Sequence, residues 1–198
     1  MSSGTIRRTE PRDVAAIATL HAALVPSSLW AELGESFLRT LYASLVRDPR
    51  FVSFVYETRA GIGAFLAGST DTGAMLRATA MREGPALAIR ALPSLRPSMI
   101  RRLLETGRYP RLRGSAGAGE SLFCAVRPEL RRQGIAAGLH EALERVLRAQ
   151  GIDRLVVTTE ASNPDAHEHL RALGFSEEGG FRFYGKAMVR YARRIGET

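Results

Sequence analysis

The chain has 198 residues, 45% of them hydrophobic and 24% charged, and its formal net charge at pH 7 is +8. A chain of this length can bury a sizeable core, and no polar or glycine-serine linker divides it, so we expect one domain over residues 1–198. No apolar run reaches the roughly 18 residues that cross a bilayer, and the N-terminus lacks the apolar centre of a signal peptide. We therefore expect a cytoplasmic protein without an integral membrane segment.

Arginine supplies almost all of the positive charge, since Lys186 is the only lysine. Such an excess is typical of proteins with an anionic partner, such as a nucleotide-bearing ligand, nucleic acid or a membrane surface, although a coding bias of the genome explains it equally well. Aromatic residues among the arginines are scarce, and helix-turn-helix and zinc-ligand patterns are missing, which argues against nucleic acid and against a metal. Cys124 lies in an apolar run and is expected in the core, not as a nucleophile.

The N-terminal third has the pattern of a strand, two helices and a hairpin. A short strand begins at Ile6, and residues 11–13 lead into a helix with an apolar face formed by Val14, Ile17, Leu20 and Leu24. A second helix over 34–47 buries a similar apolar stripe. Trp30, in the loop between the helices, is interpreted as a packing anchor. Residues 51–57 and 62–68 are expected to form two strands joined by a turn at Gly61.

Residues 71–119 separate this hairpin from the next strand and are expected to form a helical insert. Their apolar residues recur at helical spacing, and prolines at 85, 93, 97 and 110 are expected to interrupt the helices. The insert contains nine arginines and three acidic residues, so it accounts for six of the eight net positive charges. Its last part, 111–119, is basic and then glycine-rich and is expected to be a connector.

The most informative stretch, 121–138, combines a buried strand, a basic turn and the start of a helix. Residues 122–126 form an apolar run that Pro128 ends, and Gly151 ends a helix with apolar residues at helical spacing from Ile135 to Leu147. The first N–H groups of a helix have no partner within it and lie at the positive end of its dipole, so they bind phosphate where side chains leave them accessible. Gly134 and Ala136 leave this approach open, and two preceding arginines add charge.

A second block follows with the same order of elements. Residues 155–159 form another apolar strand, and Asn163 begins a helix that ends in Gly174-Phe175. His167 and His169 lie on this helix, but residues i and i+2 do not share a helix face, so we interpret them as solvated surface and not as a metal site. The remaining residues, 181–184 and 187–191, are expected to form two closing strands around a turn at Gly185.

Both blocks resemble motifs of the GNAT acetyltransferase superfamily. The pyrophosphate motif of that family is Arg or Gln, two residues, Gly, one residue, then Gly or Ala, and it corresponds here to Arg131, Gly134 and Ala136. The next motif, Asn, two residues, Ala, then a helix that ends in Gly-Phe, corresponds to Asn163, Ala166 and Gly174-Phe175. The resemblance is close over residues 120–185 and rests on pattern alone in the N-terminal third.

The resemblance implies a fold and a cofactor. The fold is a mixed α/β (α+β) domain with a central, mostly antiparallel twisted sheet of about seven strands, flanked by helices, and with the helical insert between the third and fourth strands. The cofactor is acetyl-CoA. Its pantetheine arm is expected along Cys124, Ala125 and Val126, with Asn163 beside the arm. Its pyrophosphate is expected on the residues of the basic turn: Arg131, Arg132, Gln133, Gly134, Ile135 and Ala136.

Acyl transfer from a thioester to an amine needs a neutral amine, a donor for the oxyanion and a proton source for the departing thiolate. Backbone N–H groups of the fourth strand would serve the oxyanion. Many family members place a tyrosine acid four residues before the Gly-Phe pair, and that position is Leu170 here, which packing explains. Tyr184 is the nearest substitute for the acid. Glu120 is the first candidate base and Glu160 the alternative, and either carboxylate could be ordinary surface.

The sequence therefore predicts an N-acetyltransferase that moves the acetyl group of acetyl-CoA to a primary amine of a small acceptor. Because the insert would emerge beside the cofactor, its arginines favour an anionic or nucleotide-linked, amino-sugar-like acceptor. Other interpretations stay open: a catalytically impaired acyl-CoA-binding module, an insert that docks on a nucleic acid, protein or membrane surface, and a solvated helical cap. A homodimer is also open.

Overall fold

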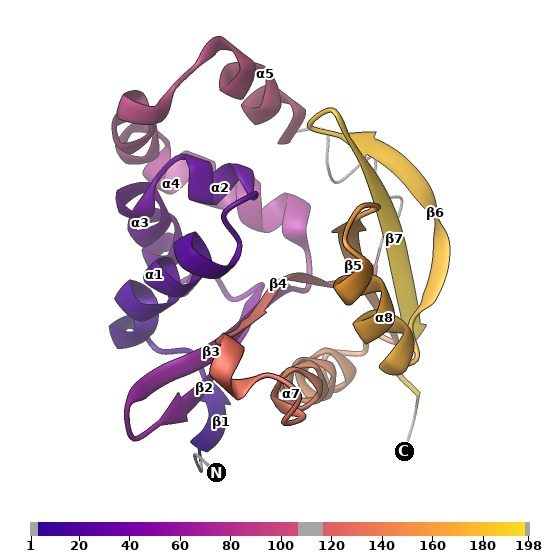
Figure 1. Ribbon diagram of the computed structural model, residues 1–198. Helices are drawn as coiled ribbons and strands as arrows, with labels where there is room; N and C mark the ends of the chain where they lie inside the picture. The colour runs from indigo at the N-terminus through magenta and orange to yellow at the C-terminus, as the bar shows by residue number, and fades with distance from the viewer. Residues whose placement is uncertain (1–3, 107–116, 197–198) are drawn as a thin grey trace.

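A computed structural model describes residues 4–106 and 117–196 of the chain. Its centre is a seven-stranded sheet in the order β1-β2-β3-β4-β5-β7-β6, and within these residues the β4–β5 pair alone is parallel (Figure 1). The strands are β1 (Gly4–Arg8), β2 (Phe51–Thr58), β3 (Gly61–Ser69), β4 (Gly119–Val126), β5 (Arg154–Glu160), β6 (Ser176–Phe183) and β7 (Lys186–Arg194).

Helices cover both faces of the sheet. One face packs against the N-terminal helices α1 (Val14–Leu24), α2 (Leu29–Glu32) and α3 (Glu35–Leu45), with the insert helices α4 (Thr72–Ala91) and α5 (Pro97–Thr106) beyond them. The other face packs against α7 (Ile135–Ala149) and α8 (Pro164–Ala172). Short 3-10 turns at Pro11–Asp13, Leu92–Ser94 and Pro128–Leu130 complete the described elements.

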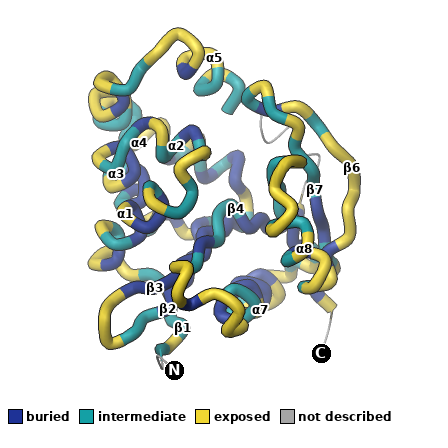
Figure 2. Tube along the Cα trace, in the orientation of Figure 1, coloured by how far each residue is buried: buried dark blue, intermediate teal, exposed yellow. Residues whose placement is uncertain are grey.

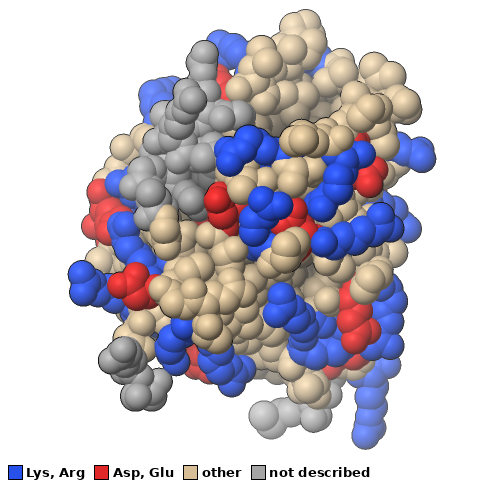
Figure 3. Space-filling view, turned by 180° about the vertical axis from the view of Figure 1, so that it is seen from behind, with Lys and Arg blue, Asp and Glu red and all other residues tan. Residues whose placement is uncertain are grey.

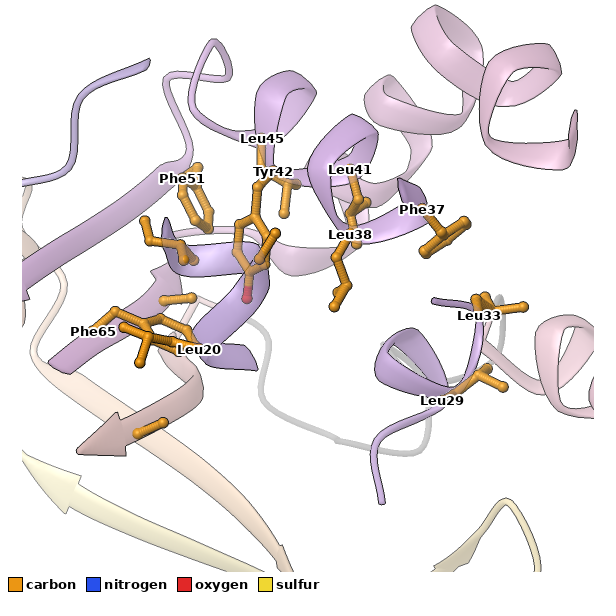
Figure 4. Close-up of a cluster of buried hydrophobic side chains, with 14 of the residues drawn as sticks. Leu20, Leu29, Leu33, Phe37, Leu38, Leu41, Tyr42, Leu45, Phe51 and Phe65 are labelled. Atoms are coloured by element: carbon orange, nitrogen blue, oxygen red, sulfur yellow. The ribbon is translucent and has the colours of Figure 1, made fainter. Parts of the chain in front are cut away.

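The N-terminal helices and the hairpin share one core. Its centre consists of side chains from α3, β2 and β3 that exclude solvent, among them Leu38, Tyr42 and Phe65 (Figure 4). His21 is also fully buried here, and its two ring nitrogens lie 2.7 Å from the Tyr42 hydroxyl and 2.8 Å from Ser28 Oγ. Burial lowers the pKa of His21 to about 4, so the imidazole is neutral at neutral pH.

A second core lies under α7. The apolar residues of this helix recur at the spacing that puts them on one face, and all of them are buried: Ile135, Leu139, Leu143 and Leu147. They pack against β2, β3 and β5, and the end of α8 closes the core with Leu170 and Phe175. Glu144, on the edge of this core, is ion-paired with Arg193 of β7. Figure 2 shows the buried strands and α7 in dark blue, whereas β6 at the edge is exposed.

The sheet opens between its two central parallel strands. β4 pairs with β3 from Glu120 to Val126, but it pairs with β5 at Gly119–Ser121 and no further within the described residues. A β-bulge lies at the same point, because Phe123 pairs with Ala67 and Ser121 with Gly68, which leaves Leu122 as an extra residue. A bulge bends its strand and increases the local twist, so it accounts for the divergence of β4 from β5.

Most expectations about the fold are confirmed, and three need correction. Pro85 does not interrupt the insert helix but lies inside α4; its side chain and Met81 face solvent, so water can satisfy the carbonyl that proline leaves unbonded. The loop after α1 contains the short helix α2, capped by Ser28. Gly119 belongs to β4 and not to a connector, while most of that expected connector, residues 111–116, lies outside the described residues.

Candidate active site

A cleft of about 560 Å³ begins where β4 and β5 part. Its walls come from seven regions of the chain: the bulged part of β4, His140 of α7, the second half of β5, α8 with the loop before it, the α1–α2 loop with the start of α2, the β6–β7 hairpin, and the insert. The insert contributes Thr72 and Leu76 from α4 and Thr106 from α5. Segments far apart in the sequence therefore meet at the opening of the sheet.

The β4 wall is apolar and aromatic. Ser121, Leu122, Phe123 and Cys124 line the cleft, and the ring of Trp30 lies 5.1 Å from that of Phe123. Trp30 is thus the packing anchor that the sequence predicts, and it also forms part of the cleft surface. Burial raises the pKa of the Cys124 thiol to about 12, so this thiol stays protonated at neutral pH, in agreement with its expected role as a core residue.

The turn between β4 and α7 has the exposed backbone that phosphate binding requires. Residues 131–134 are exposed, and two of them have left-handed backbone angles: Arg132 with φ of 60° and Gly134 with φ of 75°. Arg131 Nε donates to the carbonyl of Val126 over 3.3 Å, which holds the turn against the end of β4. A Cβ added to Gly134 would meet open space, so the approach to the first turn of α7 is unobstructed.

The remaining predicted cofactor residues differ in exposure. Ile135 is 7% exposed and anchors α7 in the second core, while Ala125 and Val126 pack on opposite faces of the sheet and do not line the cleft. Asn163 lines the cleft, and its side-chain oxygen accepts from the N–H of Ala166 at 3.1 Å. The expected N-cap of α8 is thus confirmed. Contact of these residues with a cofactor stays a prediction.

Comparison with protein families decides the identity of this site. Residues 103–175 match the model of the Acetyltransferase (GNAT) family, a span that includes β4, the basic turn, α7, β5 and α8. This match assigns the span to the GNAT acetyltransferases and indicates an N-acetyltransferase, on a fold that binds acetyl-CoA. A search of curated proteins found no match to the chain.

Solved GNAT structures share the whole fold at low sequence identity. The ribosomal-protein-S18-alanine N-acetyltransferase of Escherichia coli is 18% identical, with 99% of this chain and 96% of that chain covered and a TM-score of 0.62. An N-acetyltransferase of Staphylococcus aureus Mu50 is 16% identical, with coverage of 98% and 100% and a TM-score of 0.63. An aminoglycoside N-acetyltransferase in complex with CoA is also 16% identical, with coverage of 93% and 95% and a TM-score of 0.64.

Of the candidate catalytic groups of this GNAT protein, Glu120 is the most deeply buried. It is 1% exposed, does not line the cleft, and accepts a hydrogen bond of 2.5 Å from the hydroxyl of Thr72. Thr72 does line the cleft. Glu120 therefore lies behind Thr72, whose hydroxyl links the carboxylate to the cleft.

Tyr184 lies in the two-residue turn between β6 and β7, where it lines the cleft. Residues of α5 hold it in place. Its hydroxyl lies 2.6 Å from Thr106 Oγ1, its backbone N–H donates to Glu105 at 2.9 Å, and the guanidinium of Arg102 lies 5.0 Å from its ring centre. Burial raises the pKa of Tyr184 to about 12, so the phenol is protonated at neutral pH. The insert thus reaches across the cleft to the C-terminal hairpin, a contact that sequence patterns do not reveal.

Glu160 lies at the end of β5 and lines the cleft. Its carboxylate is 2.6 Å from Nζ of Lys186, which also lines the cleft. The single lysine of the chain is therefore placed in the site, next to the alternative base. Leu170, at the position where many family members have tyrosine, is 3% exposed and packs in the second core, as the sequence predicts.

Two histidines line the cleft, His140 and His169, and of these the sequence patterns drew attention only to His169. His140 of α7 donates from Nδ1 to the carbonyl of Ala136 at 2.9 Å, which leaves Nε2 to accept from Ser121 Oγ at 3.4 Å. Burial lowers the pKa of His140 to about 4. His169 lies 6.0 Å away between ring centres and also lines the cleft. Helical periodicity does not predict that these two residues line a cleft, because their position there depends on how α7 and α8 are arranged in the fold.

The expectation that His167 and His169 are solvated surface is wrong. His167 is tied to Tyr191 and to the carbonyl of Ala161, at 2.9 and 3.2 Å, and His169 is half-buried in the cleft wall. The contact with Tyr191 places His167 against β7. Among residues 4–106 and 117–196, no cluster of three metal-binding side chains is present. Within the same residues, no helix is long and apolar enough to cross a membrane.

Proposed function

We propose that this GNAT protein acetylates the primary amine of a small acceptor that enters the cleft between α2, α5 and the β6–β7 turn. The observation that carries the proposal is the separation of β4 from β5 after Ser121, which opens a cleft of about 560 Å³ beside the bulge. Residues from both sides of the opening line this cleft, so an acyl donor and an amine can meet there.

The residues of β4 and of the basic turn fit acetyl-CoA. The cofactor supplies an activated acetyl group as a thioester. The exposed turn at Arg131, Arg132 and Gly134 offers unobstructed N–H groups and positive charge to its pyrophosphate. Cys124 and the neighbouring positions of β4 offer backbone to the pantetheine arm, because β5 does not pair with them. Asn163, which already caps α8, lies on the opposite wall.

Two charged or polar groups at the rim are placed to move protons. We assign the base role to Glu160, because it lines the cleft, whereas Glu120 is buried next to Thr72 and does not line the cleft. Tyr184 is assigned the acid role, since its phenol is protonated at neutral pH and reaches the cleft beside Thr106. A thiolate is a good leaving group, so the acid has to supply little of the rate.

The lining favours an acceptor that carries an apolar or sugar-like ring beside its amine. Trp30 and Phe123 offer aromatic faces, and Glu160 next to Lys186 offers one polar pair. The anionic or nucleotide-linked amino sugar expected from the sequence draws no support from the described insert arginines. None of them lines the cleft; Arg102 is paired with Glu32 and Arg82 with Asp48. Arg108, Arg111 and Arg113 lie outside the described residues.

A cofactor-binding module without turnover is the second candidate, and Leu170 in place of a tyrosine favours it. Thiol release from acetyl-CoA separates the two candidates when it is measured with amino sugars, nucleotide-linked amino sugars, aminoglycosides and aromatic amines, with the acetylated product identified by mass spectrometry. Acceleration by at least one amine class supports the enzyme. Calorimetric binding of acetyl-CoA without thiol release for any class would favour the module and overturn the enzymatic proposal.

A further inference from the structure

The insert carries an apolar surface that nothing in the described structure covers. Five large hydrophobic side chains of the described residues are exposed, and all of them belong to this segment: Met81, Ile89, Leu92, Ile100 and Leu104. Their exposed fractions lie between 50% and 85%. Figure 2 shows the exposed stretches at the end of α4 and along α5, at the outer edge of the molecule.

Three of these side chains, with two smaller ones, form a stripe along α4 and into the turn that follows it. Met81, Pro85, Ala88, Ile89 and Leu92 are all exposed and are spaced by four, seven, eight and eleven residues, which places them on one side of a helix. The opposite side of α4 carries the buried Met75 and Thr79 and packs toward α3. The helix is therefore apolar on two sides, of which one is buried against the protein core and the other is exposed. We call the second side the outer face of α4.

The charges around the outer face of α4 are positive. Arg77 lies on that face one turn before Met81, and Arg96 is exposed just beyond the end of the helix. Arg90 is also exposed near this end, but nine residues separate it from Met81, which places it on another side of α4. None of these three arginines has an acidic partner among residues 4–106 and 117–196. Of the three acidic residues of the insert, Asp71 is the N-cap of α4 and Glu105 accepts the N–H of Tyr184. Glu83 lies on α4, but two residues separate it from both Met81 and Pro85, which places it away from the outer face. On the face of the molecule shown in Figure 3, basic and acidic side chains often lie next to one another.

We propose that the outer face of α4, with the exposed side of α5, docks on an anionic lipid surface. An apolar stripe bordered by arginines is the pattern of a helix that lies in the membrane interface, where apolar side chains enter the acyl boundary and guanidinium groups bind lipid phosphates. A second copy of the chain would bring arginines against arginines, so charge disfavours that occupant. The docking does not depend on which amine the cleft accepts.

The test is flotation of the full-length protein with vesicles of phosphatidylcholine, alone or mixed with phosphatidylglycerol. We expect the partition coefficient to be at least about tenfold higher for the anionic vesicles, and to fall when salt is raised. The triple variant Met81→Ser, Ile89→Ser, Leu92→Ser should lose the binding. So should the double variant Arg77→Glu, Arg96→Glu, by about tenfold or more.

A matched control has the same change of charge elsewhere. Arg59 and Arg194 are exposed and lie outside the insert, so Arg59→Glu with Arg194→Glu should keep most of the vesicle binding. Circular dichroism and thermal melting verify that each variant is folded. Equal partition into neutral and anionic vesicles, no partition into either, or equal losses in the two arginine double variants would each overturn the proposal. A dimer in size-exclusion chromatography that the triple serine variant abolishes, without vesicle binding, would assign the face to a second copy instead.

Discussion

The helices α7 and α4 are both long and both rich in apolar residues, but they differ in how these residues are arranged around the helix. α7 has one apolar face, which is buried, and a polar face that faces solvent. α4 has apolar residues on two sides, one against α3 and one exposed. The comparison teaches that periodicity locates the core when a helix has one apolar side. When both sides are apolar, the pattern does not tell which side is buried in the core, and the other side stays exposed unless a partner binds it.

The two regions also use arginine differently. In the turn before α7, Arg131 and Arg132 lie next to exposed N–H groups at a helix start, so their charge adds to a directional binding site. In the insert, Arg82 and Arg102 make ion pairs with Asp48 and Glu32 that attach the insert to the N-terminal helices. Net charge alone therefore does not locate a ligand site. The groups next to each guanidinium decide whether its charge is available to a ligand.

The largest expected difference between the regions is in stability. Leu139 of α7 is fully buried, so Leu139→Ala should lower the free energy of unfolding by about 2–5 kcal/mol through lost burial and a cavity. Leu92, at the end of α4, is 62% exposed, and Leu92→Ala should change it by less than about 0.5 kcal/mol. Urea denaturation of both variants measures the two values. Similar losses would mean that the insert is packed as tightly as the core.

Gly134 at the start of α7 tests the phosphate turn. Gly134→Trp puts a large side chain into the open space where the cofactor pyrophosphate is expected, so we expect the dissociation constant for acetyl-CoA to rise about a hundredfold. Gly151→Trp is the matched control: Gly151 ends the same helix, has φ of 73° against 75°, and its Cβ would also meet open space. Isothermal titration calorimetry that found equal affinities in the two variants would refute the assignment.

The fold was largely predictable because the central elements have one-sided patterns and clear ends. Pro128 ends β4, Gly151 ends α7, and Asn163 begins α8, each by local chemistry that a sequence displays. The site was less predictable because it depends on contacts between distant segments. Tyr184 meets Thr106 across 78 positions, and the buried Glu120 meets Thr72 across 48. The bulge at Leu122 has no signature in a continuous apolar run.

Acid should weaken the cores and leave the charges of the insert unchanged. His21 and His140 are buried and neutral, with folded pKa values of about 4, whereas an unfolded histidine titrates near 6.5. Between these values the unfolded chain binds protons that the folded chain does not, so stability is present above about pH 6.5 and is lost as pH falls toward 4. We expect about 2 kcal/mol per imidazole at about pH 5.

Urea midpoints near neutral pH and near pH 5 measure this loss. The variant His140→Gln should lose less stability on acidification than the wild type, because one of the buried histidines whose pKa is lowered is gone. The insert contains no histidine, and its arginines stay charged throughout this range. If the variant lost as much stability as the wild type, His140 would not contribute to the pH dependence of the free energy of unfolding.

The smallest expected effect lies where the two regions meet, at Tyr184. If its phenol is the acid for the departing thiolate, Tyr184→Phe should lower kcat about tenfold and leave the affinity for acetyl-CoA unchanged, since the thiolate needs little help. Thr106→Val separates this role from a bridging one. It removes the 2.6 Å contact to α5 but keeps the phenol in the cleft. If Thr106→Val cost as much as Tyr184→Phe, the tyrosine would serve to hold the insert over the cleft; if Thr106→Val alone left kcat intact, the proton would come from Tyr184 itself.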